Sequence, residues 1–165
     1  MDRIILNRGQ LDQKVHRMAY QLYEQHQDEA ELLIVGLQGN GYVFAKEIHA
    51  YFQQICPIKA RLLELKIDKE NPFNQQISCE GADAVAGMSM ALVDDVLNSG
   101  ATLIASVQYF ISKPMKRITT MVLIDRNHRR FPVAADITGM SMATTVLEHV
   151  EVRSENGLLK EVVLL

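Results

Sequence analysis

Two adjacent carboxylates, Asp94 and Asp95, follow an apolar run and precede a short turn that leads into a predicted helix. Ionised carboxylates accept hydrogen bonds and donate none, so the pair suits ribose hydroxyls or a hydrated divalent cation. In the turn, backbone N–H groups without helical partners and the positive end of the helix dipole favour a phosphate. The segment therefore predicts a site for a molecule with both a sugar diol and a phosphate. The turn would grip that phosphate with Asn98, Ser99, Gly100, Ala101 and Thr102.

The acid pair also allows a simpler interpretation. Taken alone, an Asp-Asp pair before a turn is typical of a helix cap with a solvated face. Here an apolar strand, the acid pair, a Ser-Gly turn and a helix start follow one another in that order. This order favours the binding site.

A glycine-rich loop follows another predicted strand, 32–37, and precedes a helix. Its N–H groups are placed to hold a second anion, although an ordinary turn between a strand and a helix has the same composition. A pyrophosphate would need such a cradle of its own beside the first anion site. The residues of this loop are Gln38, Gly39, Asn40 and Gly41.

Strands alternate with helices along the chain, which predicts an α/β fold with a mostly parallel central sheet flanked by helices. Hydrophobic spacing predicts helices over 8–25, 42–54 and 102–112, and strands over 3–6, 32–37, 58–67, 90–93, 117–124 and 137–139. Asn156-Gly157 predicts a C-terminal β-hairpin between strands 145–153 and 157–164. The polar stretch 68–87 is expected to be a long mobile loop that returns as a strand near Gln76.

The segment 91–102 resembles the phosphoribosyl-pyrophosphate signature of type I phosphoribosyltransferases. That signature is an apolar run, Asp-Asp-Val, two residues, Thr-Gly, one residue and Thr, with Ser99 here in place of the first Thr. A second stretch, Val-Leu-Ile-Asp-Arg-Asn-His-Arg-Arg-Phe-Pro-Val-Ala-Ala-Asp at 122–136, resembles one branch of that family. This branch comprises the pyrimidine-operon attenuation proteins that double as uracil phosphoribosyltransferases. The resemblance extends over nearly the whole chain and is weakest at 65–87.

This resemblance implies an enzyme that transfers 5-phosphoribose from phosphoribosyl pyrophosphate to a nucleobase, with uracil expected, and releases pyrophosphate with the help of Mg²⁺. Asp94 and Asp95 would orient the ribose, stabilise positive charge on its ring, and hold the metal through water or ribose hydroxyls. The Gln38 loop would bind pyrophosphate and contain a cis peptide near Leu37 or Gln38. The family also implies a homodimer or a higher homo-oligomer. Its nucleobase-side positions fall on Asp125, Arg126, Met142, Ala143 and Thr144. For Asp125 and Arg126, a surface ion pair is the alternative.

The binding loops depart from that branch at residues that carry charge. The loop 38–41 replaces Lys-Thr-Arg-Gly, and Asn98 and Ala101 replace Tyr and Arg. Loss of positive charge beside a departing pyrophosphate weakens transition-state stabilisation, and Mg²⁺ would cover part of that loss. An alternative function is therefore a catalytically weak, nucleotide-sensing regulator that binds RNA. A third is a homologue that binds nucleotides without turnover.

Length and composition limit the number of domains, the class of protein and its location. A chain of 165 residues with 48% hydrophobic and 22% charged residues predicts one soluble domain, 1–165. The net charge of −3 argues against RNA binding, because phosphate contacts need clustered Lys and Arg. No apolar run reaches the roughly 18 residues of a membrane span, and the start lacks a signal-peptide pattern. We therefore expect a cytoplasmic protein without membrane contact, in which Cys56 and Cys79 are reduced thiols.

Overall fold

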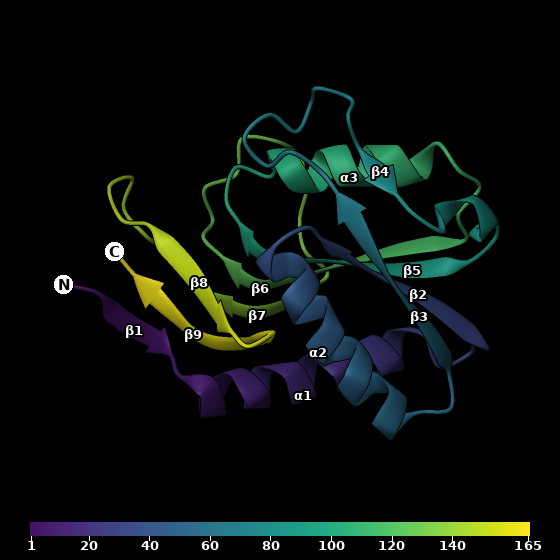
Figure 1. The fold of residues 1–165 in the computed structure, drawn as a ribbon, viewed down its shortest axis with the longest axis horizontal. Coiled ribbons are helices and arrows are strands. Elements are labelled where there is room, and N and C mark those ends of the chain that lie inside the picture. The colour runs from purple at the N-terminus through teal and green to yellow at the C-terminus, as the bar shows by residue number, and fades with distance from the viewer.

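A six-stranded sheet forms the centre of the protein (Figure 1). We describe it from a computed structural model, which covers residues 1–165 with the exception of the side chain of Ala84. The strand order is β4-β3-β2-β5-β6-β7, and every neighbouring pair is parallel except β3 and β4. The strands are β2 (Glu31–Leu37), β3 (Lys59–Lys66), β4 (Ser78–Cys79), β5 (Ser89–Leu97), β6 (Arg117–Asp125) and β7 (Ile137–Ser141).

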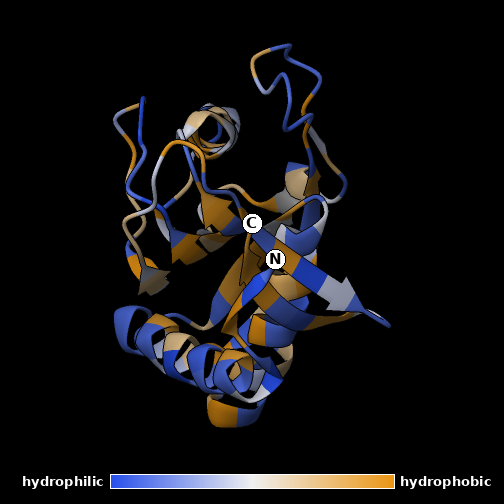
Figure 2. Cartoon of the chain, turned by 90° about the vertical axis from the view of Figure 1, so that its left-hand side faces the viewer, coloured by the Kyte–Doolittle hydropathy of each residue, from blue (hydrophilic) through white to orange (hydrophobic). Residues whose placement is uncertain are grey.

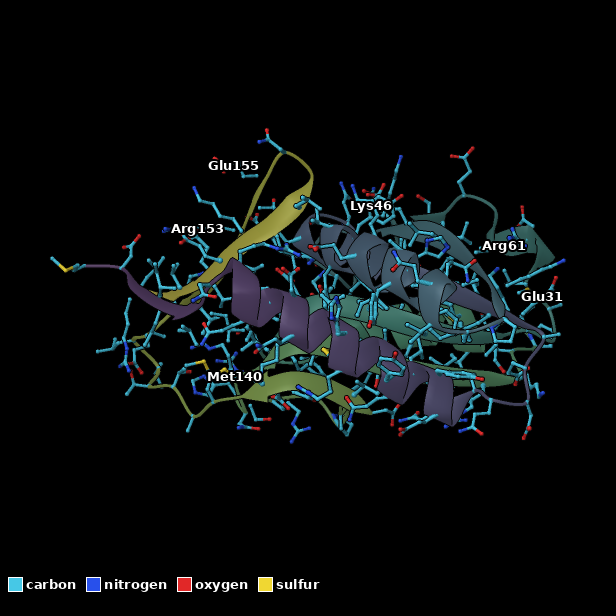
Figure 3. All side chains as sticks on the ribbon, turned by 90° about the horizontal axis from the view of Figure 1, so that it is seen from below. Glu31, Lys46, Arg61, Met140, Arg153 and Glu155 are labelled. Atoms are coloured by element: carbon cyan, nitrogen blue, oxygen red, sulfur yellow. The ribbon has the colours of Figure 1, made fainter. Side chains whose placement is uncertain are left out.

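Helices cover both faces of this sheet. α1 (Arg8–Gln25) and α2 (Asn40–Ile55) lie side by side on one face, which Figure 3 views directly. α3 (Ala101–Ile111) covers the other face, so that the apolar strands lie between two helical layers (Figure 2). Successive residues of β2 alternate between two hydrophobic cores, with Leu32 and Ile34 on the α1–α2 side and Leu33 and Val35 on the α3 side. Burial on both faces explains why these strands read as continuous apolar runs.

A smaller antiparallel sheet joins the two ends of the chain. Its order is β1-β9-β8, formed by β1 (Arg3–Leu6), β8 (Val150–Glu155) and β9 (Leu158–Leu164). Asn156 and Gly157 connect β8 and β9 with positive φ angles of 54° and 77°, as the predicted hairpin turn requires. The hairpin prediction is confirmed, whereas the pairing of β1 with β9 is not visible in the sequence pattern.

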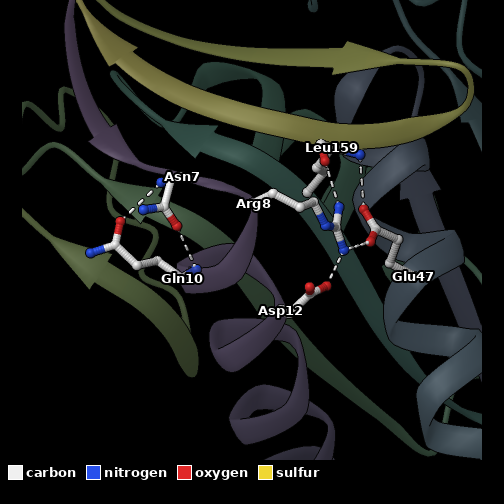
Figure 4. Close-up of polar contacts among 6 residues, drawn as sticks. All are labelled: Asn7, Arg8, Gln10, Asp12, Glu47 and Leu159. Carbon is white, nitrogen blue, oxygen red and sulfur yellow. Dashed lines mark hydrogen bonds and ion pairs between the residues drawn. The ribbon is translucent and has the colours of Figure 1, made fainter.

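Polar side chains tie the small sheet to the helices (Figure 4). The Arg8 guanidinium donates to the Leu159 carbonyl at 2.5 Å and to Glu47 at 2.5 Å, and it also pairs with Asp12. Glu47 in turn accepts from the Leu159 amide at 3.0 Å. These contacts fix β9, and with it β8, relative to α1 and α2. At the start of α1, Asn7 and Gln10 form a reciprocal capping box.

Several predicted boundaries need correction. The central strand was expected to end at residue 93, but β5 continues to Leu97 because Val96 and Leu97 pair with β6. Asp94 and Asp95 therefore lie within a strand rather than after it. The strand expected over 145–153 begins at Val150, and the strand expected near Gln76 is the short β4, followed by the 3₁₀ helix η1 (Ala82–Ala84). The predicted strand 3–6 and helix 8–25 match β1 and α1.

Candidate active site

A cavity of about 380 Å³ lies at the carboxyl end of β5, between the start of α3 and strand β8. The predicted acid pair and the whole predicted phosphate turn line it together. Residues of α2, β6 and β8, and of the segments after β3 and before β8, complete the wall. The polar residues of the lining are Asn40, Lys69, Asp94, Asp95, Asn98, Ser99, Thr102, His149 and Glu151.

The acid pair forms one side of this cavity. Asp94 is only 4% exposed, and its Oδ1 accepts a hydrogen bond from the Asp95 amide at 2.9 Å. Burial, and then the negative charge of Asp95, raises the pKa of Asp94 to about 7. A Cβ atom at Gly41 would lie 2.8 Å from Asp94 Oδ1. Only glycine therefore lets the start of α2 pack directly against the acid pair.

The phosphate turn presents free amides to the same cavity. Gly100 has a φ of +88° and precedes α3, and the Ser99 hydroxyl accepts from the Ala101 amide at 3.2 Å. The Ser99 carbonyl is occupied, because it accepts from the Arg130 and Phe131 amides at 2.8 and 3.2 Å. Among the described residues, no acceptor is paired with the amides of Ser99 and Gly100. The turn can thus donate to an anion without breaking an internal hydrogen bond.

The glycine-rich loop contributes to two neighbouring hollows. Asn40 lines the main cavity and donates from Nδ2 to the Val152 carbonyl at 2.7 Å, whereas Gln38 and Gly39 line an adjoining groove. The expectation of a cis peptide near Leu37 or Gln38 is wrong, since the described chain contains no cis peptide bond. The backbone instead turns at Gly39, which has a φ of +89°.

The polar stretch after β3 folds back over the cavity. Lys69 Nζ lies 2.9 Å from Asp94 Oδ1 and 3.4 Å from Asp95 Oδ1. Asp68 holds the turn that follows, because its carboxylate accepts from the Glu70 and Asn71 amides at 3.0 and 3.3 Å. We call residues 68–76 the lid. No local pattern in the sequence indicates that Lys69 meets the acid pair.

The lid is also anchored at its tip. The Phe73 ring packs on the Phe131 ring with centroids 5.3 Å apart. Phe131 belongs to the loop whose amides bond the Ser99 carbonyl. One chain of contacts therefore connects the lid to the phosphate turn.

The nucleobase-side candidates lie behind the turn rather than on the cavity wall. Arg126 is 7% exposed and donates to Asn98 Oδ1 at 2.9 Å, to Thr144 Oγ1 at 3.0 Å and to the Glu148 carbonyl at 2.6 Å. These partners are neutral acceptors, so Arg126 does not form the surface ion pair with Asp125 that was the alternative. Asp125 is equally buried and accepts from the Asn127 amide at 2.9 Å. The three other candidates, Met142, Ala143 and Thr144, belong to the segment between β7 and β8.

Strand β8 and the residue just before it supply two polar side chains that sequence reasoning missed. His149 and Glu151 line the cavity, while Val150 and Val152 between and beside them are buried. Polar and apolar residues alternate over 149–152, which was the available signal. This alternation predicts two different faces of the strand, but it does not indicate that the polar face would line the cavity.

The donor set fits Mg²⁺ only with help from a ligand. The described residues contain no group of three or more His, Cys, Asp or Glu side chains that could hold a metal ion. Asp94 and Asp95 offer carboxylate oxygens, which Mg²⁺ prefers, and the remaining positions would fall to water and substrate oxygens.

Within the described part of the chain, none of the helices has the length and apolar character that crossing a membrane requires.

Comparison with known proteins gives consistent matches. Residues 4–155 match the family model described as a phosphoribosyl transferase domain. The bifunctional protein PyrR of Haemophilus ducreyi is 28% identical over 164 residues, covering 94% of this chain and 92% of the relative. The PyrR of Streptococcus thermophilus is 28% identical over 142 residues, covering 84% and 82%.

Solved structures share the fold at lower identity. The hypoxanthine phosphoribosyltransferase of Trypanosoma cruzi superposes with a TM-score of 0.81 at 13% identity, covering 98% of this chain and 95% of that one. A hypoxanthine-guanine phosphoribosyltransferase of Bacillus anthracis gives a TM-score of 0.73 at 17% identity, covering 85% and 82%.

Proposed function

Because this chain belongs to the phosphoribosyl transferase domain family, we propose that it transfers 5-phosphoribose from phosphoribosyl pyrophosphate to uracil. A ring nitrogen of the base forms a bond to C1 of the ribose, the bond from C1 to the pyrophosphate oxygen breaks, and the base loses a proton. The observation that carries this proposal is one cavity lined by both an acid pair and a turn with free amides.

Each part of the cavity receives one part of the substrate. The turn 98–102 grips the 5-phosphate through its amides and hydroxyls. Asp94 and Asp95 accept from the ribose hydroxyls and stabilise positive charge on the ring as the leaving group departs. The loop 38–41 holds the pyrophosphate. Positioning and electrostatics carry the reaction, so no covalent nucleophile is needed.

Mg²⁺, when bound, supplies positive charge to the departing pyrophosphate, and Asp94 and Asp95 would hold it through water or ribose hydroxyls. We place the nucleobase on the side of the cavity nearest to Asp125, Arg126 and the segment 142–144, which lie behind the turn. Arg126 orders this side, because it joins Asn98 of the phosphate turn to Thr144.

A second candidate is a nucleotide-sensing regulator that binds RNA and turns over slowly. Two observations favour it. The curated relatives carry the name bifunctional protein, and the loop 38–41 carries no cation where charge would assist pyrophosphate release. The net charge of −3 opposes it, because RNA phosphates require clustered positive charge.

An activity panel separates the two candidates. The purified protein is incubated with Mg²⁺, labelled phosphoribosyl pyrophosphate and each common base in turn. We expect uracil to yield the labelled nucleoside monophosphate and pyrophosphate. Tight binding of phosphoribosyl pyrophosphate without product from any base would favour the regulator. Absence of binding would overturn both.

Three broader assignments belong to the same proposal. We treat residues 1–165 as one phosphoribosyltransferase domain, assembled as a homodimer or higher homo-oligomer in the cytoplasm. Light scattering coupled to size-exclusion chromatography measures the assembly directly, and a monomer at micromolar concentration would contradict it.

A further inference from the structure

The Lys69 ammonium lies on the two carboxylates that the proposed function assigns to the ribose. We propose that Lys69 is an exchangeable cation, which neutralises the acid pair in the empty cavity and moves to the pyrophosphate when ribose hydroxyls take the carboxylates. This inference rests on the proposed function and adds a residue and a sequence of contacts to it.

The contact geometry makes the ammonium and a ribose hydroxyl compete for the same oxygen of Asp94. Lys69 Nζ is 2.9 Å from Asp94 Oδ1, the same oxygen that accepts from the Asp95 amide. It is also 3.4 Å from Asp95 Oδ1. Both lone pairs of Asp94 Oδ1 are thereby taken, so a ribose hydroxyl can bond this oxygen only after the ammonium leaves. Since adjacent carboxylates repel each other, the pair favours one cation or one hydrogen-bonding diol at a time.

A destination for the ammonium lies beside it. Lys69 lines the main cavity together with Asn40, and it also lines the adjoining groove together with Gln38 and Gly39. The glycine-rich loop has no cation of its own. Lys66 borders the groove without lining the main cavity, so Lys69 is the lysine that faces both the acid pair and the proposed pyrophosphate site.

The lid backbone can stay in place during this exchange. Asp68 fixes the turn next to Lys69, and Phe73 holds the lid tip against Phe131. The Lys69 side chain, 36% exposed, lies between these anchors. Rotation of one flexible side chain is therefore enough to transfer the charge, and the transfer couples the ribose site to the pyrophosphate site.

Binding measurements on Lys69→Met test the exchange, because the two ligands should respond in opposite directions. Calorimetric titrations of the full chain with inorganic pyrophosphate and with ribose 5-phosphate are run separately at pH 8.5 without metal. We expect pyrophosphate to bind about tenfold or more weakly, the loss expected for a charge-assisted hydrogen bond. Ribose 5-phosphate should bind several-fold more tightly, because its competitor for the carboxylates is gone. Lys69→Arg should retain pyrophosphate binding.

Lys59→Met is the matched control, since Lys59 is exposed at the opposite end of β3 and should change neither affinity. Equal weakening of both ligands by Lys69→Met would show a merely structural role and overturn the inference, as would no change in either. Wild-type protein that binds neither ligand would overturn the proposed function instead.

A measurement on the wild type needs no variant. If Lys69 moves to pyrophosphate and frees the acid pair, saturating pyrophosphate should tighten ribose 5-phosphate binding, and the reverse coupling must be equal. Independent binding of the two ligands in the wild-type protein would contradict the exchange even if Lys69→Met failed to fold.

Discussion

At the carboxyl edge of the six-stranded sheet, the buried Asp94 faces an open cavity and pairs with Lys69, a residue of the lid. At the amino edge, the buried His26 lies at the end of α1, and its Nε2 is 2.9 Å from the Thr119 hydroxyl of β6. Both side chains are ionisable and nearly inaccessible. The first is paired with a charged side chain of the lid, whereas the second contacts a neutral hydroxyl within the sheet. Burial alone therefore does not mark a functional group in this fold, and what distinguishes Asp94 from His26 is a charged partner on a loop beside a cavity.

The largest effect should come from Gly100→Val, which disrupts the carboxyl edge directly. Gly100 has a φ of +88°, and a Cβ there would lie 2.7 Å from Val133 Cγ1. We expect phosphoribosyl transfer to fall below detection and the free energy of unfolding to drop by about 1–3 kcal/mol. Enzyme assay and denaturant titration measure both.

Gly157→Ala provides the matched control for Gly100. Gly157 also has a positive φ, 77°, but a Cβ there meets nothing within 4 Å and the turn is remote from the cavity. It should lose some stability and keep full activity. A crystal of Gly100→Val with phosphate still bound at the turn would refute the assigned role.

The next effect concerns the acid pair. Asp95→Asn leaves the shape of the cavity intact but removes one of the two charges that would stabilise the ribosyl cation. We expect kcat to fall about 10²–10³-fold, and the double variant with Asp94→Asn to lose ribose 5-phosphate binding altogether. Asp83→Asn in η1 changes an exposed carboxylate away from the cavity and should behave as wild type. Unchanged affinity in the double variant would remove the acid pair from the site.

The acid pair and the phosphate turn at the carboxyl edge could be predicted from the sequence, because their geometry depends on residues that are adjacent in the chain. A glycine before a helix, flanked by hydroxyls and preceded by an acid pair, already specifies the turn that the structure shows at Gly100. The predicted fold class is likewise confirmed by the match with solved phosphoribosyltransferases.

The contacts that complete the site are long-range and could not be predicted in this way. Lys69 lies 25 positions from Asp94 in sequence, and its polar surroundings resemble any exposed loop. His149 and Glu151 reach the cavity only because β9 bridges β1 and β8. The extension of β5 to Leu97 depends on pairing with β6, which no local propensity determines.

The pH profile of activity tests the role of Asp94 at the carboxyl edge. Asp94 has a pKa of about 7 and must ionise to accept from ribose hydroxyls or hold a cation, so kcat/KM should rise as pH increases through 7. The positive charge of Lys69 lowers the pKa of Asp94 against the effect of burial. Lys69→Met should therefore shift the rising limb to higher pH. A profile that stays flat from pH 5.5 to 8.5 would contradict the assigned role of Asp94.

The smallest expected effect is on stability, at the amino edge. Burial, and then the charge of Arg117, lowers the pKa of His26, with Lys116 acting in the same direction and Glu29 against it. Its Nδ1 has no hydrogen-bond partner among the described residues. The folded protein therefore favours neutral His26, whereas the unfolded chain takes up a proton as the pH falls below about 6.5. This group's contribution to stability is complete above that pH and is lost as the pH falls towards the depressed pKa of the folded state.

Denaturant titrations of wild type and His26→Gln between pH 5 and 8 measure this contribution. The wild type should lose stability on acidification more steeply than the variant. The two proteins should have the same activity at pH 8, because the cavity lies at the other edge of the sheet. His16→Gln, which alters an exposed histidine of α1, should retain the steeper wild-type dependence. Identical slopes in wild type and His26→Gln would mean that His26 is no more difficult to protonate in the folded protein than in the unfolded chain. In that case the two edges would not differ in the way their buried ionisable groups are held.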